Sequence, residues 1–491
     1  MGWFDAKRLA RRALLAVGVA LVAPAALAPE AAQARGTPDS FSELASRLLP
    51  TVVNIATTQT VKPGSMADIL PDLPPDSPLQ DLFKDYLSKN KNAPRHVTAL
   101  GSGFIIDPSG LIVTNNHVIE DADDITVTLN DGTSLPAKLV GRDPKTDLAL
   151  LKVAPSKPLP AAHFGDSDRA HIGDWVIAIG NPFGLGSSVT AGIVSARNRD
   201  LASGPYDDFI QTDAPINRGN SGGPLFDMDG NVIGVNSVIF SPSGGSVGIG
   251  FSIPANMVRE VVDQLRQFGQ ARRGWLGVRI QQVTPDIAEA LGLPGTQGAL
   301  VADVTAGGPA AKAGIENGDL IIGFDGKPVA DSRALPRIVA DTAIGKATTV
   351  DVWRKGKKEA LHVVVARLDD SDSAAAAPAK PVKAAPPKLN SKLSQLGLTL
   401  GMLDGDSRNK FHVASDIQGA VVTDVDPDSP AGEKNFRPGD VIVEVQSQPV
   451  HTPEDVAKHV EADSKAGKKI ELLLVNRDGN LTYVALRLAE G

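Results

Sequence analysis

The 491-residue sequence contains no cysteine, few aromatic residues and no excess of positive charge. Without cysteine the chain can form no disulfide, thiol nucleophile or cysteine metal site, so any covalent catalysis must use another residue. The formal net charge is −8 and aromatic residues make up 4%, which argues against the basic field and the stacking side chains of a nucleic-acid surface. We expect no nucleic-acid partner, no metal and no cofactor.

The remaining composition is that of a globular protein, with 42% hydrophobic and 22% charged residues. The length allows roughly three domains of about 150 residues each. At the N-terminus, four basic residues precede the apolar run "ALLAVGVALVAPAALA", and an A-x-A pattern ends at Ala34. This order predicts a signal peptide over residues 1–34, cleaved near Ala34. An uncleaved membrane anchor is disfavoured because two prolines interrupt a short apolar stretch.

Residues 37–268 alternate short β-branched runs with Gly, Asn, Asp and Pro. Runs such as "TVVNIAT", "WVIAIG", "AGIVSA" and "GIGFSIP" predict a mostly β domain, either a sandwich or a barrel. The stretch "ANMVREVVDQLRQFG" has apolar residues at helical spacing and ends this domain. Residues 61–95 form a polar insertion, and a loop of that length is typically mobile or functional.

An internal repeat follows. "GALVADV" reappears as "GAVVTDV", and "NGDLIIGFDGKPV" reappears as "PGDVIVEVQSQPV", each 121 positions later (Gly298 and Gly419, for example). We therefore expect two modules of about ninety residues each, over residues 273–369 and 392–490. Between them, residues 370–391 are rich in Ala and Pro, which is typical of a semi-stiff tether.

Three polar residues of the β-rich domain point to nucleophilic chemistry. His117 follows one apolar run, Asp147 precedes another, and Ser221 lies in the glycine-rich "INRGNSGGPLF". A serine attacks well only when an imidazole takes its proton, and that imidazole needs a carboxylate on its other nitrogen. Glycine at Gly219 lets the amides of Gly219 and Ser221 converge on a developing oxyanion. Singly, each residue also fits a structural histidine, a turn aspartate or a hairpin; together, they favour a catalytic triad.

The motifs "TNNHV", "TDLAL", "AIGNPFG", "TAGIVSA", "GNSGGPL" and "GIGFSIP" resemble those of the HtrA (DegP-like) family of serine proteases. The resemblance implies a mostly β fold, with a chymotrypsin-like double β-barrel protease domain followed by two α+β PDZ domains. It assigns His117 as general base, Asp147 as its orienting partner and Ser221 as nucleophile. It also implies a periplasmic location and a homo-oligomer, either a trimer or a multiple of it.

A PDZ domain adds an extended peptide to a sheet edge and captures its terminal carboxylate with backbone amides. In the first module, the resemblance places Trp275, Leu276, Gly277 and Val278 at this loop and its strand, with Arg273 as an assisting charge. The second module offers "LGLTL" at the matching position. Either module can instead only space or assemble protomers. We favour peptide binding for the first module and have no preference for the second.

These features predict an ATP-independent serine endopeptidase that degrades unfolded or damaged proteins in the cell envelope through an acyl-enzyme. Nothing in the chain resembles an ATP-binding P-loop. The expected partners are unfolded proteins and, at the PDZ domains, C-terminal peptides that order the loops around Ser221. The alternative is a holdase chaperone, alone or combined with the protease. An inactive scaffold is disfavoured because every catalytic position is filled.

Overall fold

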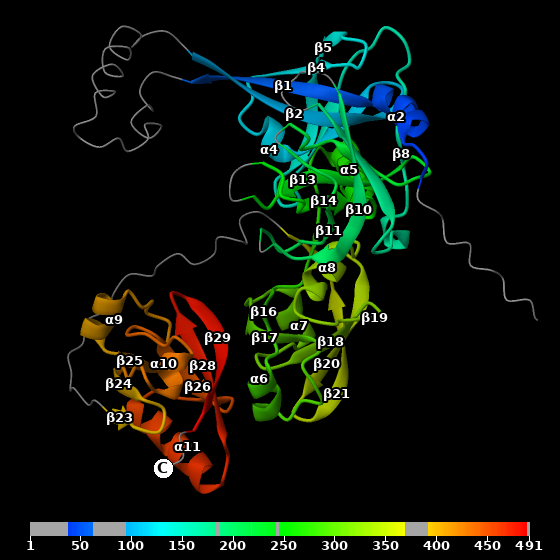
Figure 1. The fold of residues 1–491 in the computed structure, drawn as a ribbon. Coiled ribbons are helices and arrows are strands. Elements are labelled where there is room, and N and C mark those ends of the chain that lie inside the picture. The colour runs from blue at the N-terminus through cyan, green and yellow to red at the C-terminus, as the bar shows by residue number, and fades with distance from the viewer. Residues whose placement is uncertain are drawn as a thin grey trace, which may run out of the picture. The chain divides into compact units, whose positions relative to one another are not determined.

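The computed structural model describes residues 38–61, 95–181, 187–201, 203–217, 219–241, 245–368 and 391–488 (Figure 1). The predicted signal peptide, nearly all of the predicted insertion and nearly all of the predicted linker lie outside the described residues, so they stay predictions. Helix α2 (Ser42–Leu48) belongs to a unit separate from the rest of the chain, and of this unit residues 38–48 are described. No described helix is both long and apolar enough to cross a membrane.

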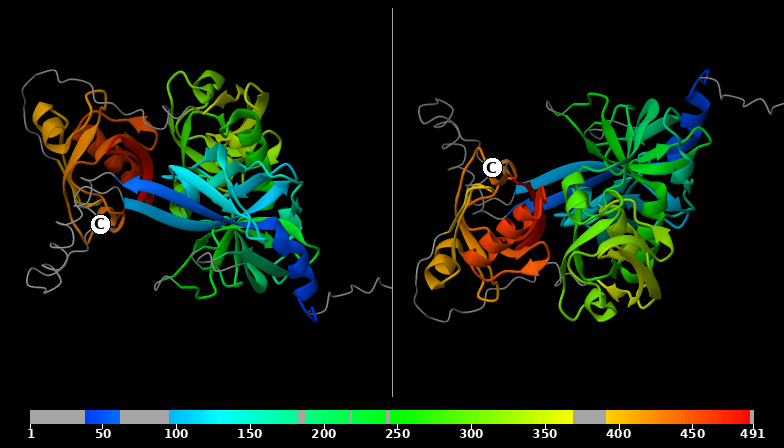
Figure 2. Two further views of the ribbon diagram at one scale, coloured as in Figure 1. Left: turned by 90° about the horizontal axis from the view of Figure 1, so that it is seen from above. Right: turned by 90° about the horizontal axis from the view of Figure 1, so that it is seen from below.

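The first sheet has seven strands within the described residues, in the order β5-β4-β1-β2-β3-β7-β6. Its core contains Ile55, Ile112 and Leu151, which are fully buried because alternate strand positions face the same side. The paired β1 and β2 extend as a long two-stranded ribbon (Figure 2). The strands of this sheet and the helices between them are η1 (Leu49–Thr51), β1 (Val52–Val61), β2 (Arg95–Asp107), β3 (Leu111–Thr114), α4 (Asn116–Ile119), β4 (Asp124–Thr128), β5 (Ser134–Pro136), β6 (Lys138–Asp143) and β7 (Leu148–Lys152).

The second sheet also has seven strands within the described residues, in the order β12-β9-β10-β11-β14-β13-β8. The predicted closing helix is present as α5, which ends at Gly269 with a left-handed φ of 72°, a conformation that glycine adopts without strain. The strands of the second sheet and the helices joined to them are β8 (His163–Phe164), η3 (Ser167–Arg169), β9 (Trp175–Gly180), β10 (Ser188–Arg199), β11 (Phe209–Thr212), β12 (Pro224–Phe226), β13 (Asn231–Ile239), β14 (Gly250–Pro254) and α5 (Ala255–Phe268).

The first module has a sheet in the order β16-β17-β18-β20-β21, with β19 paired to β18 and a separate β15–β22 ladder. Its apolar core includes Leu276, Ile321 and Phe324. Its elements are β15 (Gly274–Trp275), β16 (Val278–Gln282), α6 (Pro285–Ala290), β17 (Ala299–Val304), α7 (Pro309–Ala313), β18 (Leu320–Phe324), β19 (Lys327–Pro328), α8 (Ala334–Ala340), β20 (Ala347–Arg354), β21 (Lys357–Val364) and β22 (Ala366–Arg367).

The second module has the same central arrangement with one added edge strand, in the order β23-β24-β25-β26-β28-β29, and β27 is paired to β26. The repeat is structural, since β26 begins at Val441 and β18 at Leu320, again 121 positions apart. Its elements are β23 (Ser391–Leu393), β24 (Leu398–Met402), α9 (Gly405–Phe411), β25 (Ala420–Val425), α10 (Pro430–Glu433), β26 (Val441–Val445), β27 (Gln448–Pro449), α11 (Pro453–Lys465), β28 (Ile470–Arg477) and β29 (Asn480–Arg487).

One apparent divergence between the copies preserves the local structure. Gly314-Ile315 of the first module corresponds to Asn435-Phe436 of the second. Gly314 and Asn435 both have a left-handed backbone, with φ of 78° and 57°, and asparagine tolerates this region better than most residues do. The apolar residue that follows is buried in both cores. The pair therefore ends a helix and anchors it, and it says little about ligand choice.

Candidate active site

His117 and Asp147 are in direct contact. His117 lies in α4, just after β3, and Asp147 lies just before β7, which pairs with β3. The His117 Nδ1 atom is 2.8 Å from Asp147 Oδ2, and the His117 amide donates to Oδ1 at 2.9 Å. Because an ionised carboxylate only accepts hydrogen bonds, Nδ1 carries the proton and Nε2 is left as an acceptor. The imidazole side chain is 46% exposed, so substrate can reach it.

Asp147 is held in an unusual conformation by its neighbours. Its φ of 55° lies in the left-handed region, where a residue other than glycine is under strain. The Asp147 carbonyl accepts from the Asn115 side-chain amide at 2.7 Å and from the Asn116 backbone amide at 3.1 Å. The Ser237 hydroxyl donates to Asp147 Oδ2 at 2.7 Å. These contacts fix the carboxylate against the imidazole.

Ser221 contacts Ser237, which in turn contacts Asp147. Its hydroxyl donates to the Ser237 carbonyl at 3.4 Å rather than to His117, while the Ser237 side chain contacts Asp147. The structure therefore brings His117 and Asp147 together directly and places Ser221 beside them through a shared neighbour. No direct hydrogen bond joins the Ser221 hydroxyl to the His117 imidazole within the described residues.

The glycines around Ser221 are required by close approach and by backbone shape. Gly219 and Gly222 have φ of 98° and 85°. A Cβ atom on Gly222 would lie 2.2 Å from the Ser102 carbonyl oxygen, which no side chain can accommodate. The Asn220 amide donates within the loop, but within the described chain the amides of Gly219 and Ser221 donate to no protein acceptor. Two unused amides beside a serine are what an oxyanion hole requires.

Ser102 in β2 holds this loop from the first sheet. Its hydroxyl donates to the Gly219 carbonyl at 2.5 Å and accepts from the Asn181 amide at 2.8 Å. Its backbone amide donates to the Ser221 carbonyl at 2.9 Å. Ser102 is fully buried, so water does not compete for these bonds. The peptide units on both sides of Asn220-Ser221 are thereby anchored.

Three residues that support the site, Ser102, Ser237 and Asn115, were not predicted from the sequence. Asn115 lies within the quoted "TNNHV", and Ser102 and Ser237 are ordinary serines inside strands. The only local signal is a polar residue at a strand position that becomes buried. Strand pairing, which connects positions far apart in the chain, gives these residues their partners.

In the first module, β16 lies at the end of its sheet and begins at Val278, as strand addition requires. Gly277 has a φ of 78°. The Leu276 side chain is buried in the module core, so only its backbone is available to a ligand. Arg273 does not lie free beside this loop. Its guanidinium donates to Asp143 at 3.0 Å and it is 9% exposed.

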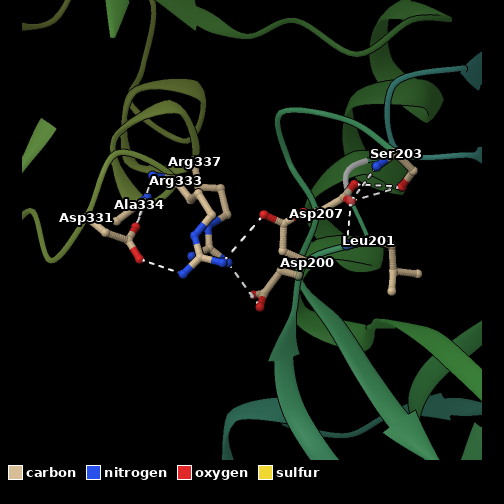
Figure 3. A network of polar contacts seen from close by, with 9 residues as sticks. Asp200, Leu201, Ser203, Asp207, Asp331, Arg333, Ala334 and Arg337 are labelled. Carbon is tan, nitrogen blue, oxygen red and sulfur yellow. Dashed lines mark hydrogen bonds and ion pairs between the residues drawn. The ribbon is translucent and has the colours of Figure 1, made fainter. Parts of the chain in front are cut away.

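The loop between β10 and β11 is joined by ion pairs to α8 and to Arg333, the residue before it (Figure 3). Asp207 accepts from two backbone amides of its own loop and so organises it. Arg337 of α8 pairs with Asp208 at 3.0 Å, and Arg333 pairs with Asp200 at 3.5 Å. These side chains are partly exposed, and exposed pairs typically contribute less than about 1 kcal/mol each. The ion pairs therefore form a weak contact, which can break at a small cost in free energy.

Comparison with known proteins agrees with this geometry. The profile of the trypsin-like peptidase domain matches residues 101–235, and that of the PDZ domain matches residues 274–365 and 394–488. A relative from Brucella suis biovar 1 (strain 1330), named "Probable periplasmic serine endoprotease DegP-like", is 45% identical over 474 residues, covering 91% of this chain and 89% of the relative. A relative of the same name from Rhizobium meliloti (strain 1021) is 44% identical over 437 residues, covering 86% and 84%.

Solved structures of HtrA-type proteases are also similar to this chain. The HtrA-type protease AlgW with decapeptide is 42% identical, with a TM-score of 0.56, and the match covers 67% of this chain and 99% of that chain. The same protease with tripeptide is also 42% identical, with a TM-score of 0.56, covering 67% and 98%. The expected mostly β fold, with a trypsin-like protease domain and two PDZ domains, is confirmed. This chain therefore belongs to the HtrA family of DegP-like serine proteases and is a serine endopeptidase.

Proposed function

We propose that His117, Asp147 and Ser221 are the catalytic triad, with the amides of Gly219 and Ser221 as the oxyanion hole. The observation that carries this proposal is the double contact between His117 and Asp147, through Nδ1 at 2.8 Å and through the backbone amide at 2.9 Å. This contact sets the tautomer that leaves Nε2 free to accept a proton.

The reaction follows from these positions. The Ser221 hydroxyl oxygen bonds to the scissile carbonyl carbon while its proton passes to His117 Nε2. The carbonyl oxygen becomes an oxyanion and accepts from the two unused amides. The imidazolium then gives its proton to the leaving amine as the C–N bond breaks, which leaves an acyl-enzyme. Water attacks the acyl-enzyme by the same proton route and regenerates the hydroxyl.

We further propose that the protein degrades unfolded or damaged proteins in the periplasm without ATP. The names of the relatives and the predicted signal peptide support this compartment. Extended segments can enter the site because the imidazole is half-exposed. The expected assembly is a homo-oligomer built from trimers, which light scattering on the purified protein measures.

The test compares wild-type protein with Ser221→Ala on unfolded casein and with a fluorophosphonate probe. We expect the variant to lose cleavage and labelling while its thermal unfolding stays unchanged. Ser109→Ala is the matched control, because Ser109 is an exposed serine of the same domain. Cleavage by Ser221→Ala at the wild-type rate would overturn the assignment.

The first PDZ domain is proposed to bind C-terminal peptides at β16 and to bias the loops around the active site. The ion pairs at α8 support this route, since Arg337 lies in α8, Arg333 directly precedes it, and the loop carries Asp200 and Asp208. A peptide with an apolar C-terminus should raise the turnover of a separate reporter substrate in the wild type. An unchanged rate at saturating peptide would rule this regulation out.

A further inference from the structure

The peptide-binding strand of the second PDZ domain is already paired along both edges. β24 is the counterpart of β16, because the loops before them are equivalent: the carbonyls of Leu276 and Leu396 accept from the amides of Ala310 and Ala431. In the described chain β16 pairs with β17 alone. β24 pairs with β25 on one side and with β23 on the other. A peptide cannot add to β24 while β23 holds that edge.

β23 also occupies the backbone amides that would otherwise donate to the terminal carboxylate of a bound peptide. The amides of Leu396 and Gly397 both donate to the Leu393 carbonyl, at 3.1 and 2.9 Å. In the first domain, neither the Leu276 amide nor the Gly277 amide donates to a protein acceptor within the described residues. The same loop is therefore open in one copy and occupied in the other.

The Leu393 side chain completes the resemblance to a bound peptide. It is 8% exposed and belongs to the apolar core of the second domain, together with Val456 and Val460 of α11. β23 contacts α11 as well as β24. An apolar side chain held between strand and helix, with its carbonyl on the loop amides, is the arrangement expected for the last residue of a PDZ ligand.

We propose that residues 391–393 are an internal ligand of the second PDZ domain. This inference deepens the peptide recognition proposed above and rests on it. The segment is covalently joined to its site by a loop of a few residues, so its effective concentration is high and external peptides compete poorly. The first domain then offers the open edge for C-terminal peptides, and the second binds an external peptide only after β23 has left.

Hydrogen exchange on the full-length Ser221→Ala protein tests this directly. Without peptide, we expect amides of β24 and of the Leu396–Gly397 loop to exchange at least about tenfold more slowly than those of β16 and its loop. The probe is a decapeptide that ends in Ser-Lys-Leu with a free carboxylate, which copies residues 391–393. It should slow exchange at β16 and leave β24 unchanged.

Two variants at one position separate backbone pairing from side-chain chemistry. Lys392→Pro removes an amide and disfavours the strand, whereas Lys392→Ala removes the same exposed charge and keeps the pairing. We expect Lys392→Pro alone to speed exchange at β24 about tenfold and to raise probe binding from one to two peptides per chain by calorimetry. Exchange at β28 shows whether the domain stays folded in this variant.

The outcomes distinguish the two proposals. Equal exchange at β24 and β16 without peptide, or slowing of wild-type β24 by the probe, would overturn the internal ligand. Slow exchange at β24 with no response of β16 to the probe would support the internal ligand and refute peptide recognition by the first domain. If Lys392→Pro unfolds the second domain, the wild-type comparison decides.

Discussion

Replacing Ser102 by alanine tests how the loop of the proposed oxyanion hole is held. The substitution removes one hydroxyl that donates to the Gly219 carbonyl and accepts from the Asn181 amide. The Ser102 backbone amide still donates to the Ser221 carbonyl, so the loop keeps one of its anchors. We therefore expect the loop to stay in place but to lose the orientation of the peptide unit that follows Gly219.

The magnitude follows from the two lost hydrogen bonds. Each contributes about 1 kcal/mol net, so up to about 2 kcal/mol of positioning is lost, which corresponds to roughly a 5- to 30-fold fall in kcat. This is less than the ~10²–10³-fold fall that follows removal of an oxyanion-hole donor. KM should stay within about twofold, because Ser102 is fully buried and so is out of reach of a substrate in solution.

The assay measures kcat and KM on fluorescent casein, with thermal unfolding of each variant by calorimetry. Ser167→Ala is the control, since Ser167 is also fully buried and its hydroxyl accepts from the Asn256 amide at 3.1 Å, away from the loop. Ser102→Thr, which keeps the hydroxyl, should recover activity. The reasoning is refuted if Ser102→Ala keeps kcat within twofold of wild type, or if Ser167→Ala loses kcat equally.

Three further predictions concern other parts of the chain. Ser237→Ala removes a donor to the Asp147 carboxylate and should lower kcat about tenfold; unchanged kcat would show that the bond is dispensable. Burial raises the pKa of Glu471 to about 7. The free energy of unfolding of the second PDZ domain should therefore fall by about 3 kcal/mol as pH rises from about 4.5 to 7. Denaturant titrations of Glu471→Gln should show a flatter dependence on pH. Gly222→Ala should leave little soluble folded protein, because its Cβ would meet the Ser102 carbonyl oxygen at 2.2 Å, and wild-type expression and Tm would contradict this.

The sequence was most informative where chemistry depends on local residue order. His117, Asp147 and Ser221 lie in motifs whose glycine and polar neighbours are adjacent in the chain, so the candidates are visible before any fold is known. The repeat offset of 121 positions is also found in the structure between β18 and β26, which are both five residues long. The sequence alone suggested that Arg273 assists the peptide loop, whereas its side chain donates to Asp143, which lies 130 positions earlier in the chain.

By itself, the sequence determined the fold class, the duplicated modules and the residue types available for proton transfer, because hydrophobic period, turn residues and short motifs are local properties. Only the tertiary structure decided that Ser237 supports Asp147, that Ser102 anchors the Gly219 carbonyl, and that β23 covers the edge of β24. Each of these contacts depends on strand register, which sets the partner of every buried polar group and cannot be read from a serine or a three-residue strand alone.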